Sequence, residues 1–259
     1  YLYKGYLYVT GEYRPFQDNG PWTNHMPLSF LIPGAVQVIF GPGLQTGRYF
    51  AVAVSLLMLA GLYVLARRFG GPWWAAGALG VVALNPAMLK TYSLAISQGL
   101  VAGMLVWVLV LTLGPGRPRW QILLGAGLAG VLMMTRINMA PLLPLLILYI
   151  FWEYGPRRGA QAAAVGLLTV AVLHAFFWPG ILRLWAHWLP GGLTPFLDPW
   201  RLSTPAPSSW SPNNDLFDRF FSFLYALRAN FIPMVGFLGF GLLGLSLIHI
   251  SEPTRLRRI

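Results

Sequence analysis

Residues 49–66 read YFAVAVSLLMLAGLYVLA, and two arginines, Arg67 and Arg68, follow them directly. The stretch carries no charge, and at ~1.5 Å of rise per residue a helix of this length crosses most of the ~30 Å hydrocarbon core of a bilayer. It therefore predicts a transmembrane helix that ends at the two arginines.

Further apolar stretches repeat this pattern along the chain. Glycine, proline and arginine separate them, as in GPGRPR at residues 114–119. Two short stretches on either side of TRIN, residues 135–138, predict a tight helical hairpin. The predicted spans are residues 73–89, 97–113, 120–134, 139–152 and 160–178, and a seventh begins at residues 231–244.

Residues 28–40, LSFLIPGAVQVIF, are apolar but too few to cross a bilayer. They predict a helix that lies in the membrane interface and is interrupted at Pro33 and Gly34. The predicted fold class is therefore all-α, a polytopic transmembrane helical bundle with an extracytoplasmic loop and interfacial helices.

The composition excludes several classes of protein. Of the 259 residues, 56% are hydrophobic and only 10% are charged, whereas an average soluble domain carries roughly 25% charged residues. The chain has no cysteine, which excludes disulfides, thiolate zinc sites and a cysteine nucleophile. Neither a P-loop nor a GxSxG elbow occurs. The net charge of +11 lies on an apolar chain without a soluble basic face, so no nucleic-acid partner is expected.

The placement of arginine predicts the orientation of the bundle. If the helices alternate in direction, three loops that are rich in arginine fall on one side, which is then cytoplasmic; their arginines are Arg67, Arg68, Arg117, Arg119, Arg157 and Arg158. Most acids then fall on the other side, namely Glu12, Asp18, Asp198, Asp215 and Asp218. We therefore expect the polar chemistry to be extracytoplasmic.

The two ends of the chain call for separate interpretation. Residues 245–255, LSLIHISEPTR, resemble the translation of a transposase-type sequencing adapter, so we expect residues 245–259 to be a non-native tail. A native helix end with a basic tail is the alternative. Residues 1–244 are then expected to be a partial transmembrane domain that lacks its first helix and its C-terminal part.

An ordered series of motifs resembles a known family. Gly11, Pro15 and Asp18 precede NHMPL at residues 24–28, and GRYFAVAVSLLMLAGLYVLARRFGG at 47–71 and LNPAMLKTYSLAISQGL at 84–100 follow. Their order and spacing resemble the bacterial dolichyl-phosphate-mannose-protein mannosyltransferase-like family, which belongs to the GT-C class of membrane glycosyltransferases. The resemblance covers about residues 5–152 and predicts a GT-C-like bundle.

The resemblance implies an inverting transfer of a hexose or pentose from a polyprenyl-phosphate carrier to an acceptor glycan, lipid or protein. The reaction would take place on the extracytoplasmic face of the plasma membrane, with a carboxylate of the first outer loop as general base. The principal acid of the family follows its first helix, and that position would precede Tyr1. The catalytic residue is therefore unknown here, Asp18 is the candidate within the chain, and the fragment by itself is expected to be inactive.

Six further residues are candidates for binding the donor under this resemblance, because cationic and hydrogen-bonding groups would hold the lipid phosphate. They are His25, Lys90, Tyr92, Gln98, Arg136 and Asn138. Each candidate has a structural alternative, such as a turn-forming Asp18, an interfacial His25, a snorkelling Lys90 or a hydrated Arg136. With Asp18, we expect the six to line one outward cavity.

Gln98 stands where members of the family often carry an acid. An amide is a poor ligand for a hard cation compared with a carboxylate, so the prediction is a site without metal or cofactor, and a divalent metal is the alternative. His174 and His187 fit no ligand spacing and predict core or interfacial histidines. Several tryptophans predict an interface belt, namely Trp178, Trp185, Trp188, Trp200 and Trp210.

A multi-spanning transporter or lipid flippase is the alternative function. Such a protein predicts charged or broken helices near the bilayer midplane and an internal repeat. The predicted spans contain no acids and the sequence shows no convincing repeat. The sequence therefore favours the transferase.

Overall fold

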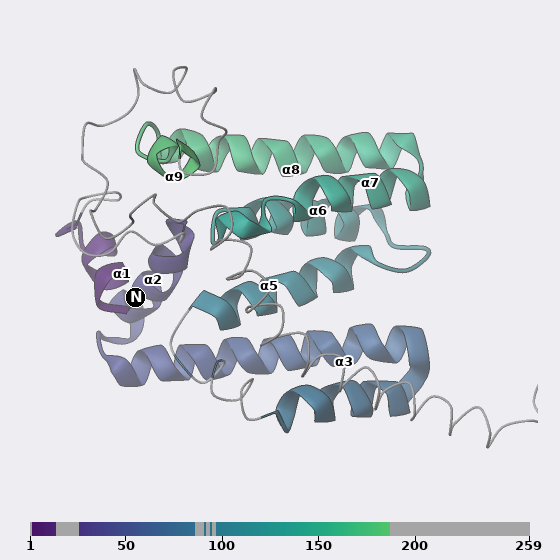
Figure 1. Cartoon of the computed structure of the whole chain (residues 1–259), viewed down its shortest axis with the longest axis horizontal. Helices are drawn as coiled ribbons and strands as arrows, with labels where there is room; N and C mark the ends of the chain where they lie inside the picture. The colour runs from purple at the N-terminus through teal and green to yellow at the C-terminus, as the bar shows by residue number, and fades with distance from the viewer. Residues whose placement is uncertain (1, 14–25, 86–90, 92–93, 95–96, 187–259) are drawn as a thin grey trace, which may run out of the picture. The chain divides into compact units, whose positions relative to one another are not determined.

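A computed structural model describes residues 2–13, 26–85, 91, 94 and 97–186, which all belong to the first of two units, Tyr1–Thr204 and Pro205–Ile259 (Figure 1). The regular elements of the described residues are all helical: α1 (Leu2–Val9), α2 (Leu28–Phe40), α3 (Leu44–Ala83), α5 (Ser97–Thr112), α6 (Arg119–Met133), the 3-10 helix η1 (Ile137–Met139), α7 (Leu142–Tyr154), α8 (Pro156–Phe176) and α9 (Leu182–Ala186). Three stretches are long and apolar enough to cross a membrane: α3, residues Ile137–Tyr154, and α8. The predicted helical membrane fold is confirmed.

Helix α3 contains two helical segments joined at a single residue. Gly71 has φ 81° and ψ −173°, a conformation that favours glycine, and Pro72 begins the second segment. The chain reverses direction there (Figure 1). The spans predicted at residues 49–66 and 73–89 correspond to these segments, although the second ends at Ala83, six residues earlier than predicted. Asn85 precedes a proline, which disfavours further helix.

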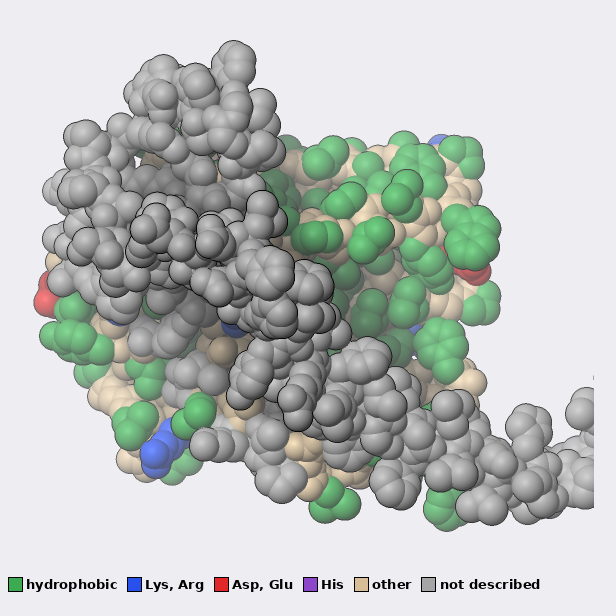
Figure 2. All heavy atoms as spheres, in the orientation of Figure 1, with side chains coloured by type: hydrophobic (Ala, Val, Ile, Leu, Met, Phe, Trp, Pro, Cys, Tyr) green, Lys and Arg blue, Asp and Glu red, His purple; other side chains and the backbone are tan. Residues whose placement is uncertain are grey.

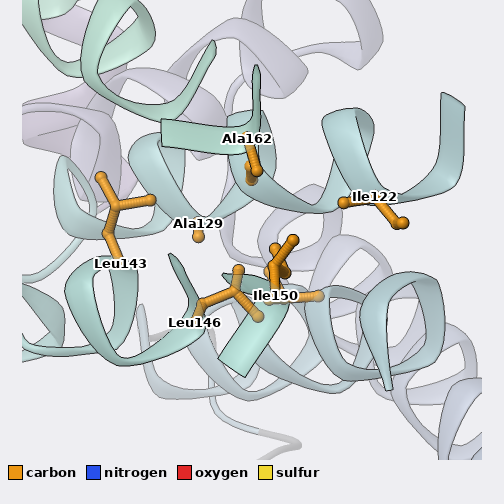
Figure 3. Close-up of a cluster of buried hydrophobic side chains, with 8 residues drawn as sticks. Ile122, Ala129, Leu143, Leu146, Ile150 and Ala162 are labelled. Atoms are coloured by element: carbon orange, nitrogen blue, oxygen red, sulfur yellow. The ribbon is translucent and has the colours of Figure 1, made fainter. Parts of the chain in front are cut away.

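The remaining long helices pack in sequence against one another. Helix α5 contacts α3 and α6, and α8 contacts α6 and α7. The core lies where α6, α7 and α8 meet (Figure 3); its buried residues are Val108, Ile122, Ala126, Ala129, Leu143, Leu146, Ile150 and Ala162. At Gly130 a Cβ atom would lie 3.0 Å from the carbonyl oxygen of Gly166, so the backbones of α6 and α8 approach closely, as in many membrane bundles. Figure 2 shows hydrophobic side chains over most of the visible described surface near α7 and α8, as lipid contact requires.

The arginine-rich loops meet at one end of the helices, as predicted. Arg68 of α3 donates from Nη1 to the carbonyl oxygens of Val110 and Leu113, at 2.9 and 2.8 Å. Arg158 of α8 donates to the carbonyl oxygen of Arg117, in the loop between α5 and α6, at 3.5 Å. We call this region, with Arg67, Arg119 and Arg157, the arginine end.

The N-terminal region differs from the prediction in two ways. The sequence predicted no helix before residue 28, but residues 2–9 form α1, which packs against α2. The predicted interruption of the second helix was also wrong, because α2 is continuous through Pro33 and Gly34. One missing N–H at Pro33 removes only one backbone hydrogen bond, and Gly34 lets the backbone of α1 approach at Gly5. Contact between the two helices compensates for the weak helix formers.

Candidate functional site

Three segments meet at the end of the bundle opposite the arginine end. They are the start of α2, the turn between α6 and α7, and the junction of α8 with α9. The backbone N–H of Leu28 donates to the carbonyl oxygen of Met134 at 3.2 Å, which joins the first two segments. A buried cluster joins all three; it contains Met26, Met134, Ile137, Phe177, Ile181 and Leu184.

The turn between α6 and α7 is held by its own hydrogen bonds. The carbonyl oxygen of Leu132 accepts from the hydroxyl of Thr135 at 2.6 Å and from the backbone N–H of Arg136 at 3.1 Å. Thr135 is fully buried, and Met139 N–H donates to the carbonyl oxygen of Arg136 at 3.0 Å. These bonds fix Arg136 in an extended conformation, with φ −155° and ψ 122°.

Arg136 carries the most informative polar group of this end. Its side chain is half-buried, and its Nε atom is inaccessible to solvent without a hydrogen-bond partner in the part of the chain that the structure describes. Buried donors are rarely left unpaired in folded proteins, and a charged one has the largest penalty. The guanidinium is therefore suited to an anionic ligand. Asn138, two residues on in η1, is exposed at the same turn.

Gln98 lies in the first turn of α5 and shows the complementary feature. Its Oε1 atom is buried and accepts no hydrogen bond from the described residues. Helices α5 and α6 are joined by residues 113–118 and pack together, so the start of α5 lies at the same end as the turn that follows α6 (Figure 1). The structure thus brings an unpaired acceptor and an unpaired cationic donor to one end of the bundle.

Four predicted site residues, Asp18, His25, Lys90 and Tyr92, lie outside the described residues. The residue after His25 is described, because Met26 is fully buried against Met134 in the turn. The predicted cavity formed by all seven residues stays a prediction.

Sequence reasoning missed one cation at this end. The Nζ atom of Lys4 lies 5.0, 5.4 and 6.0 Å from the ring centroids of Tyr13, Phe30 and Tyr8. Aromatic faces stabilise a cation at such distances. The spacing of Lys4 and Tyr8, four residues apart, could have indicated the pair, but Phe30 comes from α2 and has no signal in the sequence.

His174, predicted as a core or interfacial residue, has both ring nitrogens occupied. Trp185 Nε1–H donates to Nε2 at 2.8 Å, and Nδ1 lies 2.8 Å from the carbonyl oxygen of Val170. Since an indole nitrogen can only donate, Nε2 accepts and Nδ1 carries the proton. His174 thus anchors α9 to α8 rather than binding metal, while His187 lies outside the described residues.

The described residues contain no group of three or more histidines, aspartates and glutamates that could hold a metal ion. The candidate site is instead defined by a guanidinium, two amides and hydrophobic packing. This arrangement suits the binding of an anion and of hydroxyl groups.

A comparison with protein families matches residues 24–182 to the family described as dolichyl-phosphate-mannose-protein mannosyltransferase. The match covers more than half of the chain and runs from the residue before His25 to the first residue of α9. The chain belongs to this family. No curated protein and no solved structure matches the chain.

Membership in the mannosyltransferase family confirms the resemblance seen in the motifs. The protein is thus a membrane glycosyltransferase of the mannosyltransferase type. The matched residues include the start of α2, the turn with Arg136, the start of α5 with Gln98 and the residues between α8 and α9, all of which lie at the end of the bundle that holds the candidate site.

Proposed function

We propose that this mannosyltransferase-family protein transfers a sugar from a polyprenyl-phosphate-linked donor to an acceptor glycan, lipid or protein, with inversion at the anomeric carbon. The observation that carries the proposal is the buried Nε atom of Arg136, which has no hydrogen-bond partner among the described residues and lies in a turn that packs against the start of α2. As the sugar leaves, negative charge develops on the carrier phosphate. A guanidinium fixed in advance stabilises that charge without further reorganisation.

The remaining candidates act around that phosphate. The unpaired Oε1 of Gln98 accepts a hydrogen bond from a sugar hydroxyl, and Asn138 supplies further polar contacts beside Arg136. Lys90, Tyr92 and His25 complete the donor site, and Asp18 is the candidate base within the chain. A base is needed because the acceptor hydroxyl must lose its proton as it attacks.

The proposed reaction takes place on the extracytoplasmic face of the plasma membrane. The arginine end and the candidate site lie at opposite ends of the helices, and loops rich in arginine stay on the cytoplasmic side. Carbohydrate acceptors outside the cytoplasm and a carrier lipid within the bilayer are both accessible from that position.

The test is sugar transfer by the full-length gene product, reconstituted in vesicles with a polyprenyl-phosphate-linked mannose donor. We expect Arg136→Gln to lower the transfer rate about 100-fold, the loss that follows removal of one donor to a developing oxyanion. Lys90→Gln should lower it as well. Arg48→Gln is the matched control. Arg48 is exposed at the start of α3, and its substitution removes the same charge as Arg136→Gln.

Two results would overturn the proposal. Transfer by Arg136→Gln at the rate of the Arg48→Gln control would remove Arg136 from phosphate binding. Absence of transfer from any polyprenyl-phosphate sugar, with release of sugar from a nucleotide donor instead, would refute the donor class. The anomeric configuration of the product, read by NMR, tests inversion separately.

A further inference from the structure

The arginine end holds a concentration of positive charge that the transfer reaction does not use. Six arginines lie there, and Glu153 is the one acid in the same loops. No ion pair joins Glu153 to these arginines in the described structure. Like charges held together without acids repel each other, so this end is favourable for an anion.

Three of the arginines converge on the loop between α5 and α6. A Cβ atom at Gly114 would lie 3.3 Å from Cδ of Arg68 and 3.7 Å from Nη2 of Arg117, so both side chains flank this residue. Arg158 donates to the carbonyl oxygen of Arg117 from the start of α8. The cations thus come from α3, from the loop itself and from α8.

The loop is fixed by side chains of α7. The hydroxyl of Tyr149 accepts from the backbone N–H of Gly114 at 3.2 Å, and the hydroxyl of Tyr154 donates to the carbonyl oxygen of Thr112 at 2.9 Å. The guanidinium of Arg158 lies 5.9 Å from the ring centroid of Tyr154. A binding site held in place before the ligand arrives loses less entropy on binding.

The donors of the three arginines are used differently. Arg68 is committed to the carbonyl groups of Val110, in the last turn of α5, and of Leu113, just after it. Arg117, by contrast, has a buried Nε atom with no partner in the described part of the chain. Arg158 uses Nη1 for the carbonyl oxygen of Arg117 at 3.5 Å, so Arg117 and the other donors of Arg158 are the groups that can meet a ligand at this loop.

Exposed tryptophans lie close in sequence to these arginines and indicate which anion the arginines meet. Trp73, Trp120 and Trp152 are 83%, 61% and 87% exposed, and each lies close in sequence to one of the arginine-rich segments. Tryptophan is enriched at the level of lipid headgroups, because its ring is apolar and its N–H is polar. The arginines are therefore at the depth of phospholipid phosphates.

We propose that the arginine end binds the phosphate group of an anionic membrane phospholipid, with Arg117 and Arg158 as its donors. Guanidinium groups match phosphate oxygens in shape and charge. Basic pockets between helices at a membrane surface recognise such headgroups. The site is distinct from the donor site, and it holds whether or not the proposed transfer is correct.

The experiment measures bound lipid on the full chain, reconstituted in nanodiscs with equal parts phosphatidylcholine and phosphatidylglycerol. Native mass spectrometry then counts the lipids that the protein retains. We expect retained phosphatidylglycerol to exceed phosphatidylcholine in the wild type. Arg117→Gln and Arg158→Gln should each reduce the preference about fivefold, which corresponds to ~1 kcal/mol per arginine at a membrane surface.

Arg48→Gln is again the matched control, because it removes one exposed charge from the start of α3, at the end of the bundle opposite the arginine end. Its preference for phosphatidylglycerol should equal that of the wild type. If Arg48→Gln reduced this preference as much as Arg117→Gln and Arg158→Gln do, total charge would be the cause and the proposal would be overturned. An unchanged preference in both arginine-end variants would overturn it too. Displacement of the lipid by inorganic phosphate would assign the site to a soluble anion and refute the lipid.

Discussion

Replacing Gly34 with alanine should separate α1 from α2. A Cβ atom at Gly34 would lie 2.1 Å from the carbonyl oxygen and 2.4 Å from the carbonyl carbon of Gly5. Both atoms belong to backbone, so no side-chain rotation relieves the overlap. The helices must move apart by about 1 Å to reach ordinary contact distances.

The expected loss combines two opposing terms. Overpacking in a close contact lowers the free energy of unfolding by about 1–3 kcal/mol, and the clash with backbone places Gly34→Ala at or above the upper limit. The substitution also raises the free energy of unfolding by up to ~1 kcal/mol, because alanine favours a helix more than glycine does. We expect a net loss of ~2 kcal/mol, which lowers the melting temperature by about 4–8 °C in a chain of this size.

The assay is thermal unfolding of the purified chain in detergent, followed by far-ultraviolet circular dichroism. Gly77→Ala provides the matched control, because Gly77 is helical and, apart from the backbone of its own helix, no atom of the described residues lies within 4 Å of the Cβ it would gain. That variant should be as stable as the wild type or more so. An equal or higher melting temperature for Gly34→Ala than for Gly77→Ala would refute the close approach of α1 and α2.

Three further substitutions test the packing of the bundle. Arg68→Ala removes two hydrogen bonds to carbonyl groups of α5 and should lower the free energy of unfolding in detergent by ~2 kcal/mol, whereas an unchanged value would show that water replaces them. Ile150→Ala opens a cavity in the core and should lower the free energy of unfolding, measured by denaturant titration in detergent, by about 2–5 kcal/mol. Leu148→Ala removes a side chain that is 64% exposed and should lower it far less. Equal losses in the two variants would contradict the assigned core. His174→Leu leaves the N–H of Trp185 without its acceptor and should speed amide hydrogen exchange in α9, measured by mass spectrometry, while unchanged exchange would refute the anchor.

Sequence patterns predicted the parts of the fold that depend on local chemistry. Residues 28–40 form a helix at the predicted bounds, because Pro27 precedes it and Gly41, with φ 93°, ends it. The arginine loops came together because charge is excluded from the apolar helices between them. Helix α1 was missed, since residues 2–9 contain Gly5 and have no spanning length. Its helix is stabilised by contact with α2, which is far along the chain.

The sequence singled out candidate site residues, but it could not show which of their atoms are buried or what they contact. Arg136 and Asn138 stand out in sequence because they interrupt two apolar stretches, and the structure places them at one turn. The Oε1 atom of Gln98 has no partner among the described residues only because of the helices that cover it. The rings around Lys4 include Phe30, which belongs to another helix. Such features arise from tertiary packing, and no spacing within a single segment encodes them.

The one-residue joint at Gly71 divides α3 into halves with different evolutionary freedom. In the first half a seam of buried residues, Gly47, Ala51, Met58 and Gly61, runs along one side, and Gly61 and Val106 of α5 are in close contact. In residues 72–83 Ala75 alone is buried. Selection on packing therefore acts strongly before the joint and weakly after it. Relatives of this protein should keep small residues along the seam, while the second half drifts among apolar side chains under little constraint beyond membrane solubility.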